Sequence, residues 1–376
     1  MNIEFGAAGR GTVGLEWEMF LVDLETRELS PRAPEVLEAL GAGKDTPVRG
    51  EYLDCMVELV TGVHTSVPDG VGELRGLLAG VREVATRLGL GILPVGSHPF
   101  SHAADQPVVE NPHYDVVRRR NAWWGRRMIV SGVHVHVAVG DAALAMPVTL
   151  GLARFYPYFL ALSASSPFWE GEDTGFASQR TMMFQQLATN GLPADLHTWA
   201  EFEVYAEELY SARMISKPTE IRWDVRPAPR FGTVENRIPD SSPTLAELGC
   251  VAAWTQVVAE HVMREAAAGR SLQWLSPWLV AENKWRAARY GLDAEVITPD
   301  PTARHLPLRE GIHRVLDRLA PTASDLGCLP EFVYAEEILA RGASYERQRR
   351  VAAESGGDLV AVVDALLAEN EEGTPR

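Results

Sequence analysis

The sequence predicts an α+β fold in which a mixed or antiparallel sheet is covered on one side by helices. Strand-like segments occur in the first two-thirds of the 376 residues, and long helix-like segments follow from Thr244. The connections between the strands are unequal and often long, whereas parallel βαβ units repeat at regular spacing. No repeat, low-complexity block or charged linker divides the sequence. We therefore expect a single catalytic domain over 1–369 and a disordered tail over 370–376.

The first strand is predicted at Gly14–Asp23, and it carries two glutamates, Glu16 and Glu18. Side chains two residues apart in a strand point to the same face, about 7 Å apart. Two carboxylates on one face favour a bound cation, although a charged, solvent-exposed strand face is the better explanation of an isolated Glu-x-Glu.

The next elements alternate between strand and helix. A strand is predicted at Glu51–Thr61, with Glu58 set among apolar residues. Apolar side chains at spacings of three and four predict a helix over Pro68–Leu88. A short strand, Ile92–Val95, then ends in the sequence Gly96-Ser97-His98-Pro99.

The clearest strand signal is Met128–Val139, which is rich in β-branched residues and alternates strictly in its second half. His134 and His136 therefore share a face. A helix-like apolar stretch follows at Ala142–Ser163. The proline-broken segment Arg226–Arg230 precedes a further strand at Phe231–Ile238, which places Glu235 and Arg237 on one face.

The last third of the sequence is predicted to be helical. The apolar pattern there predicts four helices, at Thr244–Ala268, Thr302–Leu319, Pro330–Arg341 and Ser344–Ala368.

Composition limits the classes of function and the cellular compartment. The formal net charge is −16, from 35 Lys and Arg against 51 Asp and Glu, which argues against nonspecific nucleic-acid binding. The three cysteines lack Cys-x-x-Cys spacing, so neither a disulfide framework nor a zinc knuckle is indicated. The first residues lack the features of a signal peptide, and no apolar stretch is long enough to span a membrane. A soluble, cytoplasmic protein is expected.

Four predicted strands thus each offer Glu or His among apolar residues, and this repetition favours one shared pocket. A set dominated by carboxylates with one imidazole suits a hard cation, Mg²⁺ with Mn²⁺ as the alternative. Arg222, Arg226, Arg230 and Arg237 crowd the strand that bears Glu235, and Arg237 shares its face. Because arginine binds phosphate oxygens with a planar fork, carboxylates, metal and arginine together imply phosphoryl transfer. Neither a P-loop nor a dinucleotide-binding glycine motif is present, and a nucleophile elbow and a His-Glu-x-x-His pair are also missing.

Several stretches in order resemble the glutamate–cysteine ligase family, specifically its second bacterial branch of carboxylate–amine ligases, which is related to glutamine synthetase. They span roughly residues 11 to 240 and are Gly14–Glu18, Glu58–Thr61, Gly96–Pro99, Asn111–Tyr114, Gly132–Val137, Leu160–Trp169, Asp173–Gly175 and Trp223–Pro227 through Arg237.

The resemblance implies a curved antiparallel sheet, half of a funnel, with metals on its concave face and helices on its outer face. It implies an ATP-dependent reaction in which a carboxylate, commonly the γ-carboxylate of glutamate, becomes an acyl phosphate that an amine attacks. It also implies roles for individual residues. The metal ligands would be Glu16, Glu18, Glu58, His134 and Glu235; Glu235 and Arg237 would be catalytic; and Arg226, Arg180 and Arg237 would contact ATP or substrate.

One departure from the family concerns Trp17, which stands where members often carry an acidic residue. Strand alternation turns Trp17 away from the predicted metal face, so the ligand set should be unaffected. Ala188 stands where many members carry a proline, and this difference leaves the identities of the acid and amine substrates open.

The leading function is therefore an ATP- and Mg²⁺-dependent ligase for small-molecule substrates, with glutamate–cysteine ligase activity first. The alternatives are a phosphotransferase of the same fold, similar to guanidino kinases, and a non-catalytic binding protein derived from a ligase. No nucleic acid or membrane partner is expected, and a homodimer is one way to cover the edge strands of such a sheet.

Overall fold

The structure is a computed structural model that describes residues 3–43, 45–270, 275–300, 302 and 304–373, without the side chains of residues 112 and 113. Its centre is an open, antiparallel seven-stranded sheet with the strand order β10-β11-β5-β1-β3-β2. The remaining strand, β4, pairs with the end of β1 that extends past β5. The strands are β1 (Val13–Asp23), β2 (Val48–Gly50), β3 (Met56–Val60), β4 (Leu90–Leu93), β5 (Val133–Ala138), β10 (Val225–Ala228) and β11 (Thr233–Asn236).

Short strand pairs lie outside this sheet. They are β6 (Phe168–Trp169) with β7 (Glu172–Asp173), β8 (Asn190–Gly191) with β9 (Arg222–Trp223), and β12 (Glu295–Ile297) with β13 (His305–Pro307).

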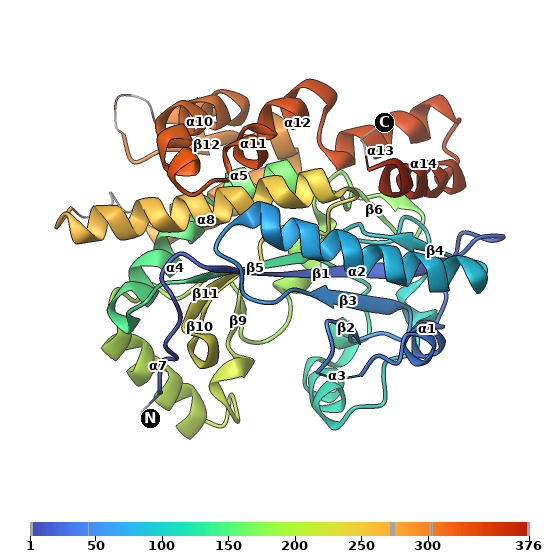
Figure 1. Cartoon of the computed structure of the whole chain (residues 1–376), viewed down its shortest axis with the longest axis horizontal. Coiled ribbons are helices and arrows are strands. Elements are labelled where there is room, and N and C mark those ends of the chain that lie inside the picture. The colour runs from blue at the N-terminus through green and yellow to red at the C-terminus, as the bar shows by residue number, and fades with distance from the viewer. Residues whose placement is uncertain (1–2, 44, 271–274, 301, 303, 374–376) are drawn as a thin grey trace.

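The described α-helices follow the chain from the sheet into a C-terminal helical layer (Figure 1). They are α1 (Ala33–Ala39), α2 (Val67–Arg87), α3 (Pro112–Gly125), α4 (Ala145–Arg154), α5 (Tyr156–Ser163), α6 (Gln179–Phe184), α7 (Trp199–Ser211), α8 (Leu245–Ala267), α9 (Pro277–Tyr290), α10 (Leu308–Asp325), α11 (Leu329–Val333), α12 (Ala335–Arg341), α13 (Ser344–Glu354) and α14 (Leu359–Glu372).

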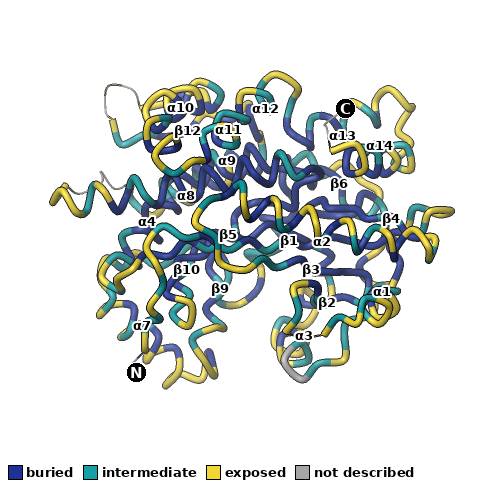
Figure 2. Tube along the Cα trace, viewed as in Figure 1, coloured by how far each residue is buried: buried dark blue, intermediate teal, exposed yellow. Residues whose placement is uncertain are grey.

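The main core lies between one face of the sheet and the helices α2 and α8. Alternate residues of β1, among them Leu15, Trp17 and Met19, belong to this core together with Trp254 of α8. Trp17 is fully buried, and its Nε1 donates a hydrogen bond to Ser241 Oγ over 3.1 Å. Figure 2 shows the sheet and most of α8 as buried chain beneath exposed outer helices and loops. Strand alternation therefore turns Glu16 and Glu18 to the opposite face, as predicted.

The structure confirms the α+β class, with an open antiparallel sheet and helices on its outer face. Three predicted strands shorten to the residues that pair, because strand propensity alone does not decide where pairing stops. By contrast, β1 begins one residue before the predicted start, and β4 lies two residues before the predicted strand 92–95. The segment predicted as strand at Met128–Val139 pairs as β5 only from Val133, and its earlier part makes isolated bridges at Val130 and Gly132. Pro227 lies in β10 at the edge of the sheet, where its missing N–H costs no ladder hydrogen bond.

Four helix predictions need correction. The stretch 330–341 is two short helices, α11 and α12, which meet at Tyr334. The stretch 142–163 is two helices, because Pro157 in the first turn of α5 cannot continue the helical ladder from α4. The stretch 344–368 is α13 and α14, separated by Gly356 and Gly357 at φ of +71° and +93°. The helix predicted at 302–319 begins at Leu308, because 305–307 pair with β12; residue 303 lies outside the described residues.

The predicted tail, 370–376, begins too early, since α14 continues to Glu372 and residues 374–376 lie outside the described residues. The sequence did not predict α3, α6, α7 and α9. None of the described helices is both long and apolar enough to cross a membrane. The extent of the domain, the homodimer and the cytoplasmic location stay predictions.

Candidate active site

The register of the sheet brings the predicted ligands of four strands to one face. Glu18 of β1 lies opposite Glu58 of β3, and Glu16 lies opposite His134 of β5. Glu235 belongs to β11, which pairs with the other edge of β5, and its Oε1 is 4.0 Å from His134 Nδ1. The residues predicted from four separate strands therefore form one cluster on the face away from α2 and α8.

Two groups of candidate ligand atoms in this cluster share Glu16. One group is Glu16, Glu58 and His134, and the other is Glu16, His136 and Glu235; in each group, one ligand atom per residue lies within 4.8 Å of the others. His134 Nδ1 is 2.9 Å from Glu16 Oε2, and His136 Nε2 is 3.5 Å from Glu16 Oε1. Carboxylate and imidazole ligands suit Mg²⁺ or Mn²⁺, so the arrangement could hold two neighbouring ions with Glu16 between them.

The hydrogen bonds and the pKa of His134 indicate whether these residues fit a metal ion. Its Nε2 is buried without a hydrogen-bond partner among the described residues, 3.7 Å from Glu18 Oε1. Burial, together with the charge of Arg237, lowers the pKa of His134 to about 4, so the ring is neutral at pH 7. With Nδ1–H donating to Glu16, the lone pair of Nε2 points toward the carboxylates, as a metal ligand requires. The residues fit the predicted ion.

The carboxylates themselves also favour a cation. Burial raises the pKa of Glu58 well above its ordinary value, and the nearby charges of Glu16 and Glu51 raise it further. Burial and the charge of Glu51 likewise raise the pKa of Glu18 to about 8, although Glu18 Oε2 accepts a 2.7 Å hydrogen bond from Gly132 N. A divalent cation among these groups would stabilise their ionised forms.

Glu16 behaves differently from these neighbours. Burial alone would raise its pKa, but hydrogen bonds with His134 and His136 outweigh burial and hold the pKa well below the ordinary value. Glu16 is therefore ionised at neutral pH and ready to bind a cation.

Two of the predicted arginines hold Glu235. Arg226 Nε donates to Glu235 Oε2 over 2.6 Å, and Arg237 Nη1 donates to Oε1 of the same carboxylate. Burial would raise the pKa of Glu235, but the charges of these arginines hold it well below its ordinary value. Arg237 Nη1 also lies 3.5 Å from His134 Nδ1, so the guanidinium adjoins the first ligand group.

Arg180 has a different position from that of Arg226 and Arg237. It is buried, its Nη1 donates to the carbonyl of Ile238 over 3.2 Å, and it lies 3.8 Å from the carboxylate of Asp240. Its guanidinium thus fixes the chain just after β11, while its side chain still lines the cavity described next.

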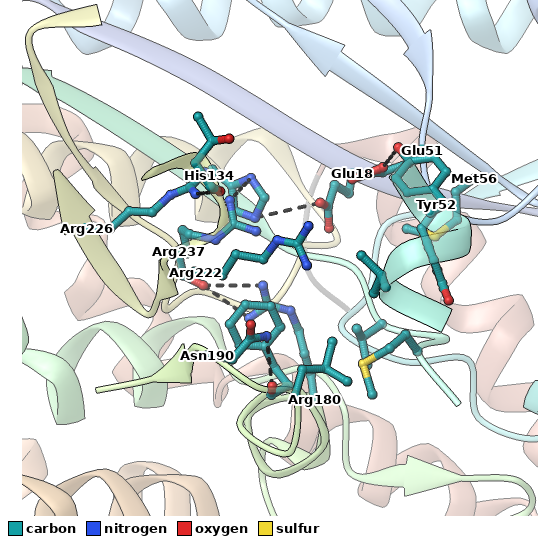
Figure 3. A pocket seen from close by; sticks show the side chains of 17 residues that line it. Glu18, Glu51, Tyr52, Met56, His134, Arg180, Asn190, Arg222, Arg226 and Arg237 are labelled. Atoms are coloured by element: carbon teal, nitrogen blue, oxygen red, sulfur yellow. Dashed lines mark hydrogen bonds and ion pairs between the residues drawn. The ribbon is translucent and has the colours of Figure 1, made fainter. Parts of the chain in front are cut away.

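A cavity of about 320 Å³ opens over this cluster (Figure 3). Glu18, His134 and Arg237 lie on the sheet side of the cavity, and Arg222 reaches into it from β9. Apolar and aromatic side chains form another part of the cavity wall, namely Tyr52, Met56, Val117, Met128, Val130, Phe184 and Leu187. The site can therefore place an anionic group beside the metal ligands and an apolar group against the wall.

Sequence reasoning missed several residues of this site. His136 was predicted to share the face of His134 but was left out of the ligand set, and the Val-His-Val-His alternation could have included it. Arg49 of β2 donates to Glu58 Oε2 over 2.6 Å, and no strand was predicted there. Glu51 accepts a 2.7 Å hydrogen bond from Tyr114 of α3, an element that was not predicted.

Solved structures share this fold. The glutamate–cysteine ligase of Francisella tularensis in complex with AMP has a TM-score of 0.69 at 13% identity, over 96% of this chain and 92% of that one. The bifunctional glutathione synthetase of Pasteurella multocida has a TM-score of 0.66 at 16% identity, over 96% of this chain and 52% of that one. Because the sequence identities are only 13% and 16%, these similarities establish the fold alone.

Sequence relatives identify the class. A protein of Arthrobacter sp. (strain FB24) named "Putative glutamate–cysteine ligase 2-1" is 44% identical over 99% of both chains. A protein of Nocardia farcinica named "Putative glutamate–cysteine ligase 2-2" is 46% identical over 98% of both chains. With this fold and site, the chain is a ligase that forms carbon–nitrogen bonds. The model of glutamate–cysteine ligase family 2 matches residues 12–365, and the chain belongs to that family.

Proposed function

We propose that the protein is an ATP- and Mg²⁺-dependent carboxylate–amine ligase that works through an acyl phosphate. The observation that carries this proposal is the pair of ligand groups sharing Glu16, with Arg237 beside them at the edge of one cavity. Glutamate and cysteine are the proposed acid and amine, because family relatives covering almost the whole chain carry that activity in their names.

The proposed reaction has two steps. A carboxylate oxygen of the acid bonds to the γ-phosphorus of ATP as the bond to the leaving ADP oxygen breaks. The amine nitrogen then bonds to the acyl carbon, inorganic phosphate leaves with its bonding electrons, and the amine loses a proton. The products are an amide of γ-glutamyl type, ADP and phosphate.

The side chains of the site divide these tasks. Mg²⁺ held by Glu16, Glu18, Glu58, His134, His136 and Glu235 would supply positive charge to the phosphates and the substrate carboxylate. Arg237 would hold oxygens of the transferring phosphoryl group, and Glu235 keeps its guanidinium oriented through their ion pair. Arg226 fixes Glu235 from the neighbouring strand. Arg180 would act by positioning the segment that follows Arg237, because it donates to the carbonyl of Ile238.

The test is turnover with ATP, Mg²⁺, glutamate and a panel of amines, with ADP, phosphate and product mass measured. The proposal expects ADP and phosphate only when acid and amine are both present. Release of AMP and pyrophosphate would contradict it. Transfer of phosphate to an acceptor without release of free phosphate would instead identify a phosphotransferase. Absence of turnover with every acid would identify a non-catalytic binding protein.

Matched variants locate the activity. Glu16→Gln and Glu235→Gln should each lower turnover about a hundredfold or more, because each removes a charge from the proposed metal and phosphate site. Glu83→Gln is the control, since Glu83 lies on the surface of α2 and forms an exposed ion pair with Arg87. Circular dichroism should show folded protein in all three variants. Activity close to wild type in Glu16→Gln or Glu235→Gln would refute the assigned roles.

A further inference from the structure

A second cavity, of about 290 Å³, lies on the helical side of the molecule, outside the candidate active site. It is formed by α4, α5, α9, α10 and the β12–β13 pair, several of which Figure 1 shows grouped around α8. None of its lining residues lines the cavity over the metal-ligand cluster. Any ligand here would therefore occupy a separate site.

Arginines from two helices converge on this cavity. Arg154 comes from the end of α4, and Arg314 and Arg318 are one helical turn apart on α10. Arg314 pairs with Glu310 over 2.5 Å. In the described part of the chain, Arg154 and Arg318 have neither a hydrogen bond nor an ion pair with a carboxylate. Asp300 lines the cavity too, and its Oδ1 accepts hydrogen bonds from Thr302 N and Oγ1.

The three arginines that line this cavity also lie near the phenol of Tyr158. Burial raises the pKa of the Tyr158 phenol, and the charges of Arg154, Arg318 and Arg314 act in the opposite direction. Burial also lowers the pKa of Arg154, and the charge of Arg318 lowers it further. Arg314 and Arg318 are exposed and Arg154 is half-buried, so an anion bound among the three guanidinium groups would reduce their mutual repulsion.

Part of the cavity lining is apolar. Pro157, Val296, Leu306 and Val315 line it and are buried, and Phe155 lies beside them. The Tyr158 ring is held firmly, since it stacks on Trp254 with 6.3 Å between ring centroids. A ligand that fills this cavity would set an apolar body against these side chains and an anionic group among the guanidinium groups.

We propose that this cavity binds a small organic phosphate monoester, with the phosphate held by Arg154, Arg314 and Arg318 and the organic group against the apolar floor. A phosphate dianion matches several cations better than a single carboxylate, and arginine forks bind its oxygens in pairs. The site does not depend on the proposed ligase reaction, because it uses none of the active-site residues.

Phenyl phosphate is the probe, with inorganic phosphate and benzoate as the comparison arms, and titration calorimetry on the full chain is the measurement. Phenyl phosphate should bind more tightly than either comparison anion. Arg318→Gln should weaken its binding about tenfold, and Arg154→Gln combined with Arg318→Gln should weaken it further. Arg318 is exposed, so its single variant should fold.

Two control variants separate this site from other effects. Arg87→Gln removes an exposed arginine of α2 and should leave binding unchanged. Arg226→Gln alters the candidate active site and should also leave this binding event in place. Loss of phenyl phosphate binding only in Arg226→Gln, or wild-type binding in the double variant, would overturn the proposal. Equal binding of phenyl phosphate and inorganic phosphate would overturn the assigned ligand class.

Thermal unfolding supplies a second, independent readout. Without phosphate, Arg318→Gln should melt no lower than wild type, because the substitution relieves repulsion between cations. Phenyl phosphate should raise the melting temperature of wild type more than that of Arg318→Gln. A lower melting temperature of Arg318→Gln without any anion would show that Arg318 has a structural role and would contradict the proposed binding role.

Discussion

At the scale of single residues, alternation along a strand predicts the direction of a side chain but not its partner. It placed Glu16 and Glu18 on one face and turned Trp17 away from that face, and in the structure Trp17 lies in the core. It could not predict that Glu16 contacts both histidines while Glu18 accepts a hydrogen bond from Gly132 N. Those contacts depend on pairing between β1 and β5, which are more than a hundred residues apart in the chain.

His98 is a buried histidine whose neutral form the fold requires. Its Nε2 lies 2.9 Å from the carbonyl oxygen of Arg27, and its Nδ1 accepts hydrogen bonds from Ser101 N at 2.9 Å and Phe100 N at 3.2 Å. A proton on Nδ1 would abolish both accepted bonds. Burial lowers the pKa of His98 to about 4.

This arrangement predicts loss of stability in mild acid. The unfolded chain takes up a proton on His98 near its ordinary pKa of about 6.5, whereas the folded chain does so only near 4. The free energy of unfolding should therefore fall as the pH drops from about 6.5 to about 4, by on the order of 3 kcal/mol. Urea unfolding of wild type at pH 7 and pH 5 measures the fall.

The matched variant is His98→Asn, which keeps an acceptor for the backbone N–H groups but does not titrate. It should be less stable than wild type at pH 7 and lose less stability between pH 7 and pH 5. The exposed His102, replaced by Asn, is the control and should retain the wild-type dependence. An identical pH dependence in wild type and His98→Asn would count against the neutral, buried histidine.

At the scale of elements, the sequence predicts a helix well where a continuous apolar stripe is buried. The helix predicted at 68–88 is α2, and its buried residues include Leu74, Leu78 and Val81. By contrast, α9 buries Asn283 and Lys284 and exposes Trp278, so its pattern does not resemble an amphipathic helix. Lys284 is buried because its Nζ pairs with Asp224 Oδ2 over 2.8 Å, a contact between distant segments that no local pattern contains.

Ionic contacts also tie the last two helices to the core. Arg347 of α13 donates from Nη2 to Glu247 of α8 over 2.8 Å, and its Nε and Nη2 each donate to Glu369 of α14 over 2.9 Å. All three side chains are buried. Gly356 and Gly357 separate α13 from α14, and the hydrogen bonds from Arg347 to Glu369 join the two helices across this break.

Replacing Arg347 with Met should therefore lower the free energy of unfolding by about 3–5 kcal/mol, because it leaves buried carboxylates without their cation. The exposed Arg87→Met, which loses an i,i+4 ion pair with Glu83, is the control and should change stability by about 0.5 kcal/mol or less. Adding Glu247→Gln and Glu369→Gln to Arg347→Met should restore part of the loss. Urea unfolding measures each variant, and a loss below about 1 kcal/mol in Arg347→Met would refute the expected role.

At the scale of the whole molecule, the class of fold could be predicted because the strand signals lie in the first two-thirds of the sequence at unequal spacing and helix signals dominate the last third. The order of the strands could not, since β11 reaches β5 over almost a hundred residues and no local pattern specifies such a pairing. The candidate site depends on this order: the same residues in another strand order would not share Glu16 between two ligand groups. The family resemblance implied the curved antiparallel sheet and the roles of individual residues, but no order of the strands.

The net charge of −16 and the buried carboxylates of the candidate site together predict that Mg²⁺ stabilises the fold. An ion that binds only the folded chain raises its stability by mass action, so millimolar Mg²⁺ should raise the melting temperature of wild type by a few degrees, roughly. Salt also screens the repulsion among surface acids, and the comparison must therefore use NaCl at equal ionic strength. Glu16→Gln should lose the increment specific to Mg²⁺, since both ligand groups use Glu16, whereas the surface variant Glu83→Gln should keep it. Equal shifts with Mg²⁺ and matched NaCl in wild type would mean that screening alone stabilises the protein and that the carboxylate cluster does not bind the ion.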